Sequence, residues 1–175
     1  MKPDIEPVAV TGVWVRHLPA GGDPLWWPPE PPDGRWQRGR IVGGLYLADS
    51  ADTAWAEWYR WLAATARRPL DALPRDLWRY RIKLDRIADL STPDRLAATG
   101  LPAPEPDARQ WPAFQTIGER LHADGWSGVR YPSAARPAAR ALCLFRAGRD
   151  IASVRPVPPP VPHAEPPAPP RGLRT

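Results

Sequence analysis

Cysteine and histidine are scarce in the 175-residue sequence, which has one cysteine and three histidines. A single cysteine excludes a disulfide within the chain and a cage of thiolate metal ligands. Cys143 lies in the apolar run ALCLF with no cation or histidine beside it, so we expect a buried structural thiol. His17, His122 and His163 lie far apart in different predicted elements, which disfavours a metal site. We therefore expect no bound metal, although His17, at the end of a predicted strand, is a candidate to line a cavity.

Long hydrophobic runs and the common catalytic motifs are also missing. No window approaches the length of a membrane span, and the first residues, MKPDIEPVAVTGVW, have no apolar signal-peptide region. A cytoplasmic protein without a membrane partner is expected. The sequence contains no GxGxxG, P-loop, HExxH or GxSxG motif. Any catalysis would therefore depend on carboxylate, arginine, tyrosine and hydroxyl groups.

The composition is that of a globular protein with a basic surface. Apolar residues make up 43% of the chain, which has 10 Trp and a formal net charge of +5. Such a charge favours nucleic acid, an anionic membrane or a phosphate-bearing ligand, but the basic residues form no blocks. Proline is over-represented, with 26 residues, nine of them between Pro156 and Pro170. We predict one folded domain over 1–157 and an extended, mobile tail over 158–175, which has no core-forming residues.

The order of the predicted elements indicates an α+β domain. A helix over 51–67 has Ser50 as its N-cap and Asp52 in its first turn. Glu57 lies on the border of its apolar face, roughly 40° from Trp61, where a partly buried carboxylate at a cleft edge is expected. The other predicted elements are strands over 8–18, 43–49, 77–85 and 151–157, two strands within 128–146 joined by a turn at Pro132–Ser133, and helices over 91–100 and 111–125.

Three polar residues occur at nearly equal intervals in the segment from Asp33 to Trp58. Arg35 could clamp a phosphate, Tyr46 could stack on a ring, and Glu57 could bind sugar hydroxyls and stabilise an oxocarbenium-like centre. Together they suit cleavage of an N-glycosidic bond in a nucleotide that carries a pyrophosphate. The alternative is structural: Arg35 pairs with a surface carboxylate, Tyr46 belongs to the core, and Glu57 is solvated.

The stretch GRWQRG followed by GGLYLADSADTAWAEW resembles the signature of the RES domain family. Two more segments fit that family in the same order. One is VWVRHL, which is similar to its opening strand with an arginine, and the other is WPAFQTIGERLHADGWSGVRYPSAA, which is similar to its helix and following strand. The resemblance runs from about Val13 to Val157. Asp33, where a second glycine often precedes Gly-Arg-Trp, and the Trp/Pro-rich loop over 19–33 depart from the pattern.

The resemblance implies a single domain similar to the ADP-ribosyltransferases and diphtheria-type toxins, with a central, split, mostly antiparallel sheet and flanking helices. It also implies a toxin that consumes NAD⁺ by cleaving the nicotinamide–ribose bond, neutralised by an Xre-like helix-turn-helix antitoxin, and nucleic acid contacted only through that antitoxin. The implied catalytic residues are Arg35, Tyr46, Glu57 and Ser133. Those implied to bind the NAD⁺ substrate are Arg16, Arg35, Tyr46 and Gln115.

Several alternatives stay open at the level of sequence. The acceptor of ADP-ribose could be water, phosphate or a protein side chain, the last making the protein a mono-ADP-ribosyltransferase. A non-catalytic module could instead bind nucleic acid through Arg79, Arg81 and Lys83, which form one cationic face of the strand over 77–85. The loop over 19–33, with its paired tryptophans, is either a hydrophobic flap over the core or a substrate lid.

Overall fold

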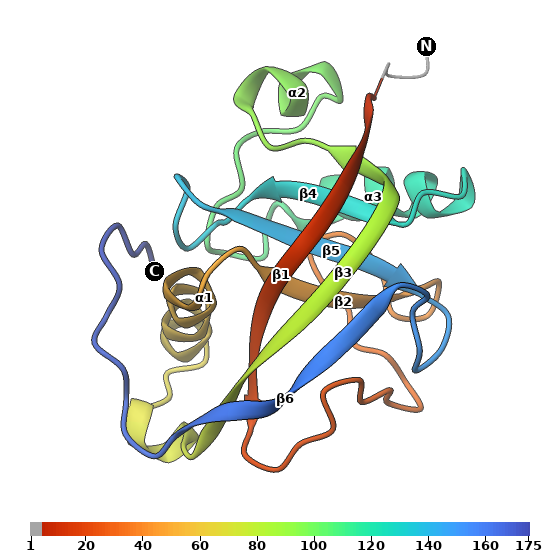
Figure 1. Ribbon diagram of the computed structural model, residues 1–175. Helices are drawn as coiled ribbons and strands as arrows, with labels where there is room; N and C mark the ends of the chain where they lie inside the picture. The colour runs from red at the N-terminus through yellow and green to blue at the C-terminus, as the bar shows by residue number, and fades with distance from the viewer. Residues whose placement is uncertain (1–4) are drawn as a thin grey trace.

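The computed structural model describes residues 5–175, so the first four residues of the predicted domain lie outside the described part of the chain. Within that part, six strands and three α-helices form one α+β domain, as predicted (Figure 1). The elements are β1 (Pro7–Pro19), β2 (Gly43–Ala48), α1 (Ala51–Ala64), a 3₁₀ turn (Pro69–Ala72), β3 (Arg75–Asp89), α2 (Pro93–Ala98), α3 (Trp111–Ala123), β4 (Gly128–Pro132), β5 (Arg140–Arg146) and β6 (Val154–His163).

The sheet is mostly antiparallel and closes on itself. Its strand order is β1-β2-β5-β4-β3-β6, and β1 also pairs with β3, which completes a ring of five strands. The pairing of β3 with β4 is parallel, and the other pairings are antiparallel. Closing a sheet in this way leaves few unpaired edges and encloses apolar side chains.

The ring is split where β1 meets β2. These two strands share a single registered pair, Val15 with Ala48. In contrast, β1 pairs with β3 along its whole length, from Pro7 opposite Ala88 to Pro19 opposite Arg75. Because β1 stays paired with β3, it diverges from β2 beyond Val15. The strands β1 and β2 then form the two walls of a wedge. The split, mostly antiparallel sheet implied by the family resemblance is therefore confirmed.

The long strand β3 shows why this sequence forms a half-buried strand. Tyr80 and Ile82 are at most 2% exposed, while Arg79, Arg81 and Lys83, which alternate with them, are exposed. A period of two places alternate side chains on opposite faces of a strand, so the apolar set enters the core and the cations face solvent. The cationic face predicted from the sequence is confirmed.

Helix α1 begins at the predicted cap. The Ser50 side chain accepts a hydrogen bond from the Thr53 amide at 3.3 Å, and Asp52 lies in the first turn. Buried Trp55, Trp58 and Leu62 attach the helix to the sheet. This packing fixes the rotation of α1, and with it the direction of its border residue Glu57.

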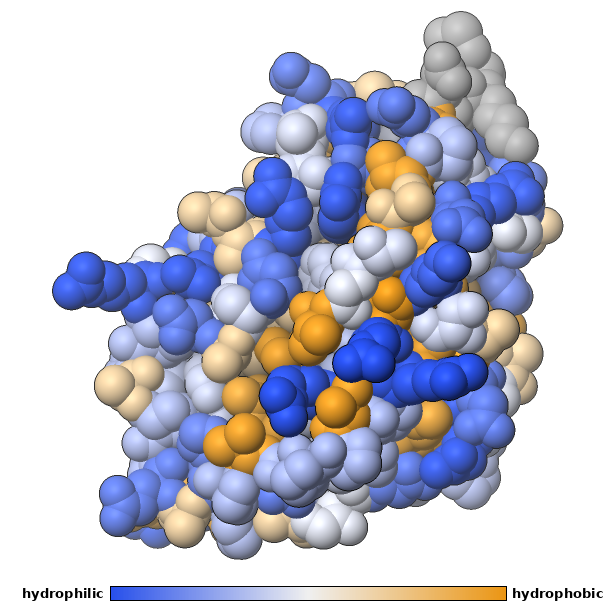
Figure 2. All heavy atoms as spheres, in the orientation of Figure 1, coloured by the Kyte–Doolittle hydropathy of each residue, from blue (hydrophilic) through white to orange (hydrophobic). Residues whose placement is uncertain are grey.

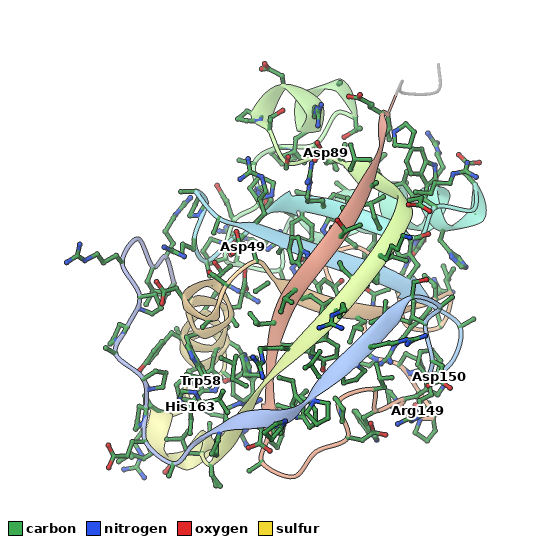
Figure 3. The ribbon with its side chains drawn as sticks, in the orientation of Figure 1. Asp49, Trp58, Asp89, Arg149, Asp150 and His163 are labelled. Carbon is green, nitrogen blue, oxygen red and sulfur yellow. The ribbon has the colours of Figure 1, made fainter. Side chains whose placement is uncertain are left out.

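The last strand extends farther than the sequence predicted. β6 runs to His163, beyond the expected end at Val157, and pairs with the start of β3. A strand this rich in proline is possible because β6 is an edge strand, where missing amide donors leave no neighbour unpaired. The end of β6 packs against α1, where the ring centroids of His163 and Trp55 lie 4.7 Å apart; His163 is labelled in Figure 3.

The segment after β6 turns back beside α1 (Figure 1). The Tyr59 hydroxyl donates to the Pro167 carbonyl at 2.5 Å, and the Arg174 amide donates to the Ala135 carbonyl at 2.7 Å. The residues from Pro158 onward are therefore in contact with the domain, where the sequence predicted a free tail. Proline carbonyls remain good acceptors, which the composition alone did not reveal.

Gly118 of α3 allows the helix to touch the loop that carries the predicted site. A Cβ at this position would lie 1.9 Å from the Trp36 carbonyl oxygen. We predict that Gly118→Ala destabilises the fold by about 2–4 kcal/mol in urea unfolding, because backbone must move to relieve the clash. Gly148→Ala is the matched control, since nothing lies within 4 Å of a Cβ there. Equal stability of the two variants would contradict this reading.

Candidate active site

The wedge between β1 and β2 opens into a cavity of about 890 Å³. Its size falls in the usual range for small-molecule and cofactor sites. One wall is the end of β1, from Val15 to Pro19, and the other is formed by Gly44, Tyr46, Leu47 and Ala48 of β2. Because the strands diverge, neighbouring residues of β1 that point to opposite faces of the sheet both reach this space. The remaining lining comes from α1 and the segment after it, from the loop before β2, from the start of α3, and from residues at the ends of β3, β4 and β5.

Helix α1 contributes Ala54, Glu57, Arg60 and Trp61 to the cavity. Their spacing places them on one stripe of the helix. The Glu57 carboxylate is held at both oxygens: Oε2 accepts from Nε of Arg60 at 2.8 Å, and Oε1 accepts from the Ser133 hydroxyl at 2.6 Å. The predicted position of Glu57, partly buried at the edge of a cleft, is confirmed.

Ser133 is fully buried and reaches the cavity only through Glu57. Its hydroxyl donates to Glu57 and accepts from the Arg136 amide at 3.1 Å. A serine that both donates and accepts in this way fixes one orientation of the carboxylate. The structure therefore brings Ser133 and Glu57 together, although they are 76 positions apart in the chain.

Arg35 lies in the cavity wall with only 6% of its surface exposed. Its guanidinium stacks over the Phe114 ring, 5.3 Å from the centroid, and Nη2 donates to the Glu105 carbonyl. Nη1 is buried without a hydrogen-bond partner among the described residues. Burial lowers the pKa of Arg35, and the Tyr131 and Glu57 side chains act in the opposite direction. A buried donor without an acceptor is costly, so this nitrogen is suited to an oxygen of a ligand.

Tyr46 is half-buried and faces the cavity beside Arg35. Its hydroxyl donates to Oε1 of Gln37 at 2.5 Å and accepts from the Trp36 amide at 3.1 Å. Burial raises the pKa of Tyr46 well above its usual range, so the phenol stays neutral. Gly34 makes this arrangement possible, because a Cβ there would lie 2.3 Å from the Tyr46 hydroxyl.

Gln115 is placed differently from the other predicted ligand-binding residues. It is 7% exposed and is absent from the cavity lining. Its side-chain amide donates to the Gly34 carbonyl at 2.9 Å, which ties α3 to the turn that carries Arg35. Gln115 therefore holds the turn that carries Arg35 in position without lining the cavity itself.

Arg16, His17 and Arg75 form a second polar cluster in the cavity, in which the two arginines carry the charge. Arg75 donates from Nε to Nδ1 of His17 at 3.0 Å, and His17 stacks on Trp55 with a ring separation of 5.4 Å. Within residues 5–175, the Arg16 side chain makes no hydrogen bond or ion pair, and Arg75 makes no ion pair. Burial lowers the pKa of both arginines, and the charge of Arg16 lowers that of Arg75 further. Two nearby cations without a carboxylate partner form a site for an anion.

The sequence predicted Arg16 in this group, and His17 as a residue that lines a cavity, but not Arg75 or Arg60. Arg60 follows Glu57 by three positions, a spacing at which side chains meet on a helix, so its pairing could have been recognised. Arg75 reaches the cavity because it pairs with Pro19 across the β1–β3 register. No local pattern in the sequence indicates that register.

The exposed cations of β3 lie outside the cavity. Arg155 of β6 pairs with Arg81, and Val13 of β1 lies on the other side of Arg81. Figure 2 shows this face, over β1, β3 and β6, as a mixture of strongly hydrophilic and hydrophobic side chains. Arg79, Arg81 and Lys83 make no ion pair within the described residues.

Residues 5–175 contain neither a metal-binding cluster nor a helix that could span a membrane. No group of three or more histidine, cysteine and acidic side chains is arranged to hold a metal ion. None of the helices there has the length and apolar character needed to cross a membrane. Cys143 is buried, as predicted, and burial raises its pKa to about 12.

The structural class is an α+β domain with a split sheet, and among the described residues the split holds a glutamate together with arginines that make no ion pair. The family model of the RES domain matches residues 13–166, and the chain belongs to this family. Seven chains of solved structures match as well. One is from the crystal structure of the M. tuberculosis MbcT–MbcA toxin–antitoxin complex, with a TM-score of 0.74 and 23% identity over 89% of this chain and 86% of that chain. At this identity the likeness shows a shared fold. No curated protein matches the sequence.

His17 should make the stability of the protein depend on pH. Burial, and then the charges of Arg75 and Arg16, lower its pKa well below 6.5. The unfolded chain therefore binds a proton that the folded protein does not, and the free energy of unfolding falls as the pH drops below about 6.5.

We predict that wild type loses stability between pH 7.5 and pH 5.5 more steeply than His17→Gln, by at most about 1.4 kcal/mol per pH unit. Urea unfolding of both proteins at several pH values measures the difference, and groups common to both cancel. Parallel pH profiles would show that His17 titrates normally.

Proposed function

We propose that this protein cleaves NAD⁺ at the bond between nicotinamide and ribose. The observation that carries this proposal is one cavity in which Glu57, anchored by Arg60 and Ser133, lies together with Arg16, Arg35 and Arg75, which have no carboxylate partner among the described residues. The resemblance to the RES family implies the same substrate. An N-glycosidic bond with a cationic leaving group needs an anion near the sugar and cations near the phosphates, which is the charge distribution of this cavity.

Binding of the pyrophosphate is assigned to Arg16 and Arg75. Both guanidiniums are partly desolvated and without an ion pair in the described chain, so a diphosphate replaces repulsion between them with two charge-assisted contacts. Arg35 offers its unpaired Nη1 to a ribose or phosphate oxygen at the reacting end. Tyr46, whose ring is fixed through its hydroxyl, is assigned to contact the nicotinamide.

Glu57 is assigned to the chemical step. When the C1′–N bond breaks, its electron pair leaves with nicotinamide and positive charge develops on the ribose. The Glu57 carboxylate stabilises that charge and accepts a hydrogen bond from a ribose hydroxyl. Where water is the acceptor, its attack at C1′ with loss of one proton gives ADP-ribose. Ser133 and Arg60 are positioning residues that hold both carboxylate oxygens before substrate arrives.

The acceptor of the ADP-ribosyl group remains a choice between water, phosphate and a protein side chain. Water gives ADP-ribose, phosphate gives ADP-ribose carrying a new phosphate ester, and a protein acceptor gives a labelled macromolecule. Chromatography of the products from labelled NAD⁺, with and without phosphate and cell extract, distinguishes the three.

The biological role that we propose is that of a toxin with a protein antitoxin. Support comes from membership of the RES family and from the shared fold with a chain of the MbcT–MbcA toxin–antitoxin complex. The proposed partner is an Xre-like helix-turn-helix protein that presents an acidic helical segment to the cationic cavity. Such a segment complements the unpaired arginines and would compete with NAD⁺.

Glu57→Gln should abolish most of the activity. We predict a fall in kcat of about 10²- to 10⁴-fold for nicotinamide release, because the amide removes the negative charge but keeps the shape. The matched control is Glu165→Gln at an exposed position, which should behave as wild type. In a bacterial host, expression of wild type should lower cellular NAD⁺ and arrest growth, whereas Glu57→Gln should do neither. Equally low nicotinamide release by wild type and Glu57→Gln would contradict the proposal.

A polyanion-binding module is the second candidate, favoured by the exposed, unpaired cations of β3. If this function holds, replacing Arg79, Arg81 and Lys83 together with glutamine should remove salt-dependent retention on immobilised DNA or RNA, and Arg35→Gln should leave it unchanged. Retention that is weak for wild type, or that survives the triple substitution, excludes this role.

A further inference from the structure

The exposed indole of Trp26 is not explained by the fold. Trp26 lines the cavity and is 62% exposed, the most exposed of the tryptophans that do so. It belongs to the proline-rich loop between β1 and β2. An exposed indole leaves a large apolar surface in water, which a ligand could cover.

The loop holds Trp26 in place through its backbone. Arg146 donates to the carbonyl of Trp26 at 2.7 Å and to that of Leu25 at 3.3 Å, and the Tyr80 hydroxyl donates to the Pro24 carbonyl at 2.8 Å. The neighbouring Trp27 is used as an anchor, because its ring packs against Gly43 and lies 5.0 Å from the Arg146 guanidinium. The main chain is thus fixed while the ring of Trp26 remains free, which is the arrangement of a stacking platform.

Trp26 lies at the end of the cavity that is away from Glu57. The Trp26 carbonyl accepts a hydrogen bond from Arg146, the last residue of β5. Glu57 accepts a hydrogen bond from Ser133, which directly follows β4 at the point where β4 pairs with Arg140, the first residue of β5. The length of β5 therefore separates the loop that carries the indole from the carboxylate at the reacting end.

Two other tryptophans in the lining are less available. Trp61 already has the Arg67 guanidinium over its ring at 5.4 Å, and the Trp111 ring nitrogen is buried without a hydrogen-bond partner in the described chain. Trp26 has no ring partner or cation–π partner among residues 5–175. Its π-face is the one that a ligand base can cover.

We propose that Trp26 stacks on the second base of a dinucleotide, and so makes the enzyme select NAD⁺ over a mononucleotide. The inference rests on the proposed function and adds a specificity residue to it. Aromatic stacking accepts any flat base, so the selection acts on the presence of a second nucleotide rather than on its identity. A ligand that ends at the first phosphate has no second base to cover the indole.

The test compares NAD⁺ with nicotinamide mononucleotide as substrates of wild type, Trp26→Ala and Trp26→Tyr. Trp26→Ala should raise KM for NAD⁺ by roughly 5- to 100-fold, the size of one base–aromatic stack. It should leave kcat for NAD⁺ and both constants for the mononucleotide nearly unchanged. Trp26→Tyr should retain most of the preference for NAD⁺, because it retains a stacking ring. Leu70→Ala is the control, since Leu70 is a 72% exposed apolar residue outside the cavity lining.

The outcomes separate the inference from the function on which it rests. If wild type cleaves neither substrate, the proposed function fails. If wild type cleaves NAD⁺ and Trp26→Ala changes both substrates equally or neither, the function stands and the role of Trp26 is overturned. Unchanged kinetics with weakened binding of a protein partner would make Trp26 a protein contact, which also overturns the inference.

Discussion

The divergence of β1 from β2 after one shared pair is the constraint on which the rest of the molecule depends. β1 is committed to β3 from Pro7 to Pro19, so it cannot also follow β2 past the Val15–Ala48 pair. The wedge that results admits side chains from both faces of β1. Arg16 and His17, which point to opposite faces of an ordinary strand, are thereby brought to one cavity.

Electrostatic imbalance follows from that geometry. No carboxylate of the described chain pairs with Arg16 or Arg75 in the cavity. The Glu57 carboxylate is already held by Ser133 and Arg60. The folded protein accepts unpaired, partly desolvated cations, which cost stability. Binding of an anion to these cations should raise the free energy of unfolding, and this links the stability of the fold to the proposed NAD⁺ chemistry.

The packing around the turn before β2 fixes the positions of Arg35 and Tyr46 in the cavity. Gly34 leaves room for the Tyr46 hydroxyl, and Gln115 holds the Gly34 carbonyl from α3. Gly118 lets α3 approach close enough for that contact. Each of these residues acts on the position of Arg35 or Tyr46 without lining the cavity with a functional group of its own. The resemblance grouped Gln115 with the ligand-binding residues, because a sequence motif cannot separate a residue that touches a ligand from one that supports it.

Local patterns in the sequence determined the elements and much of their orientation. The Ser50 cap fixed the start of α1, the period of two in β3 fixed its buried and cationic faces, and the apolar face of α1 set Glu57 at a border. These features depend on neighbours within a few positions, which is why they could be predicted. The family resemblance added the split sheet and the set of residues that includes Ser133.

Only the tertiary structure decided which distant side chains meet. Arg75 binds His17 because of the β1–β3 register, Ser133 reaches Glu57 across 76 positions, and β6 continues through a proline-rich segment because it lies at an edge. Trp26 and Trp27 are adjacent in sequence, but one is anchored over Arg146 and the other is left exposed at the cavity. Register, closure of the ring and the path of a long loop are set by the sum of many non-local contacts, and no local pattern in the chain encodes them.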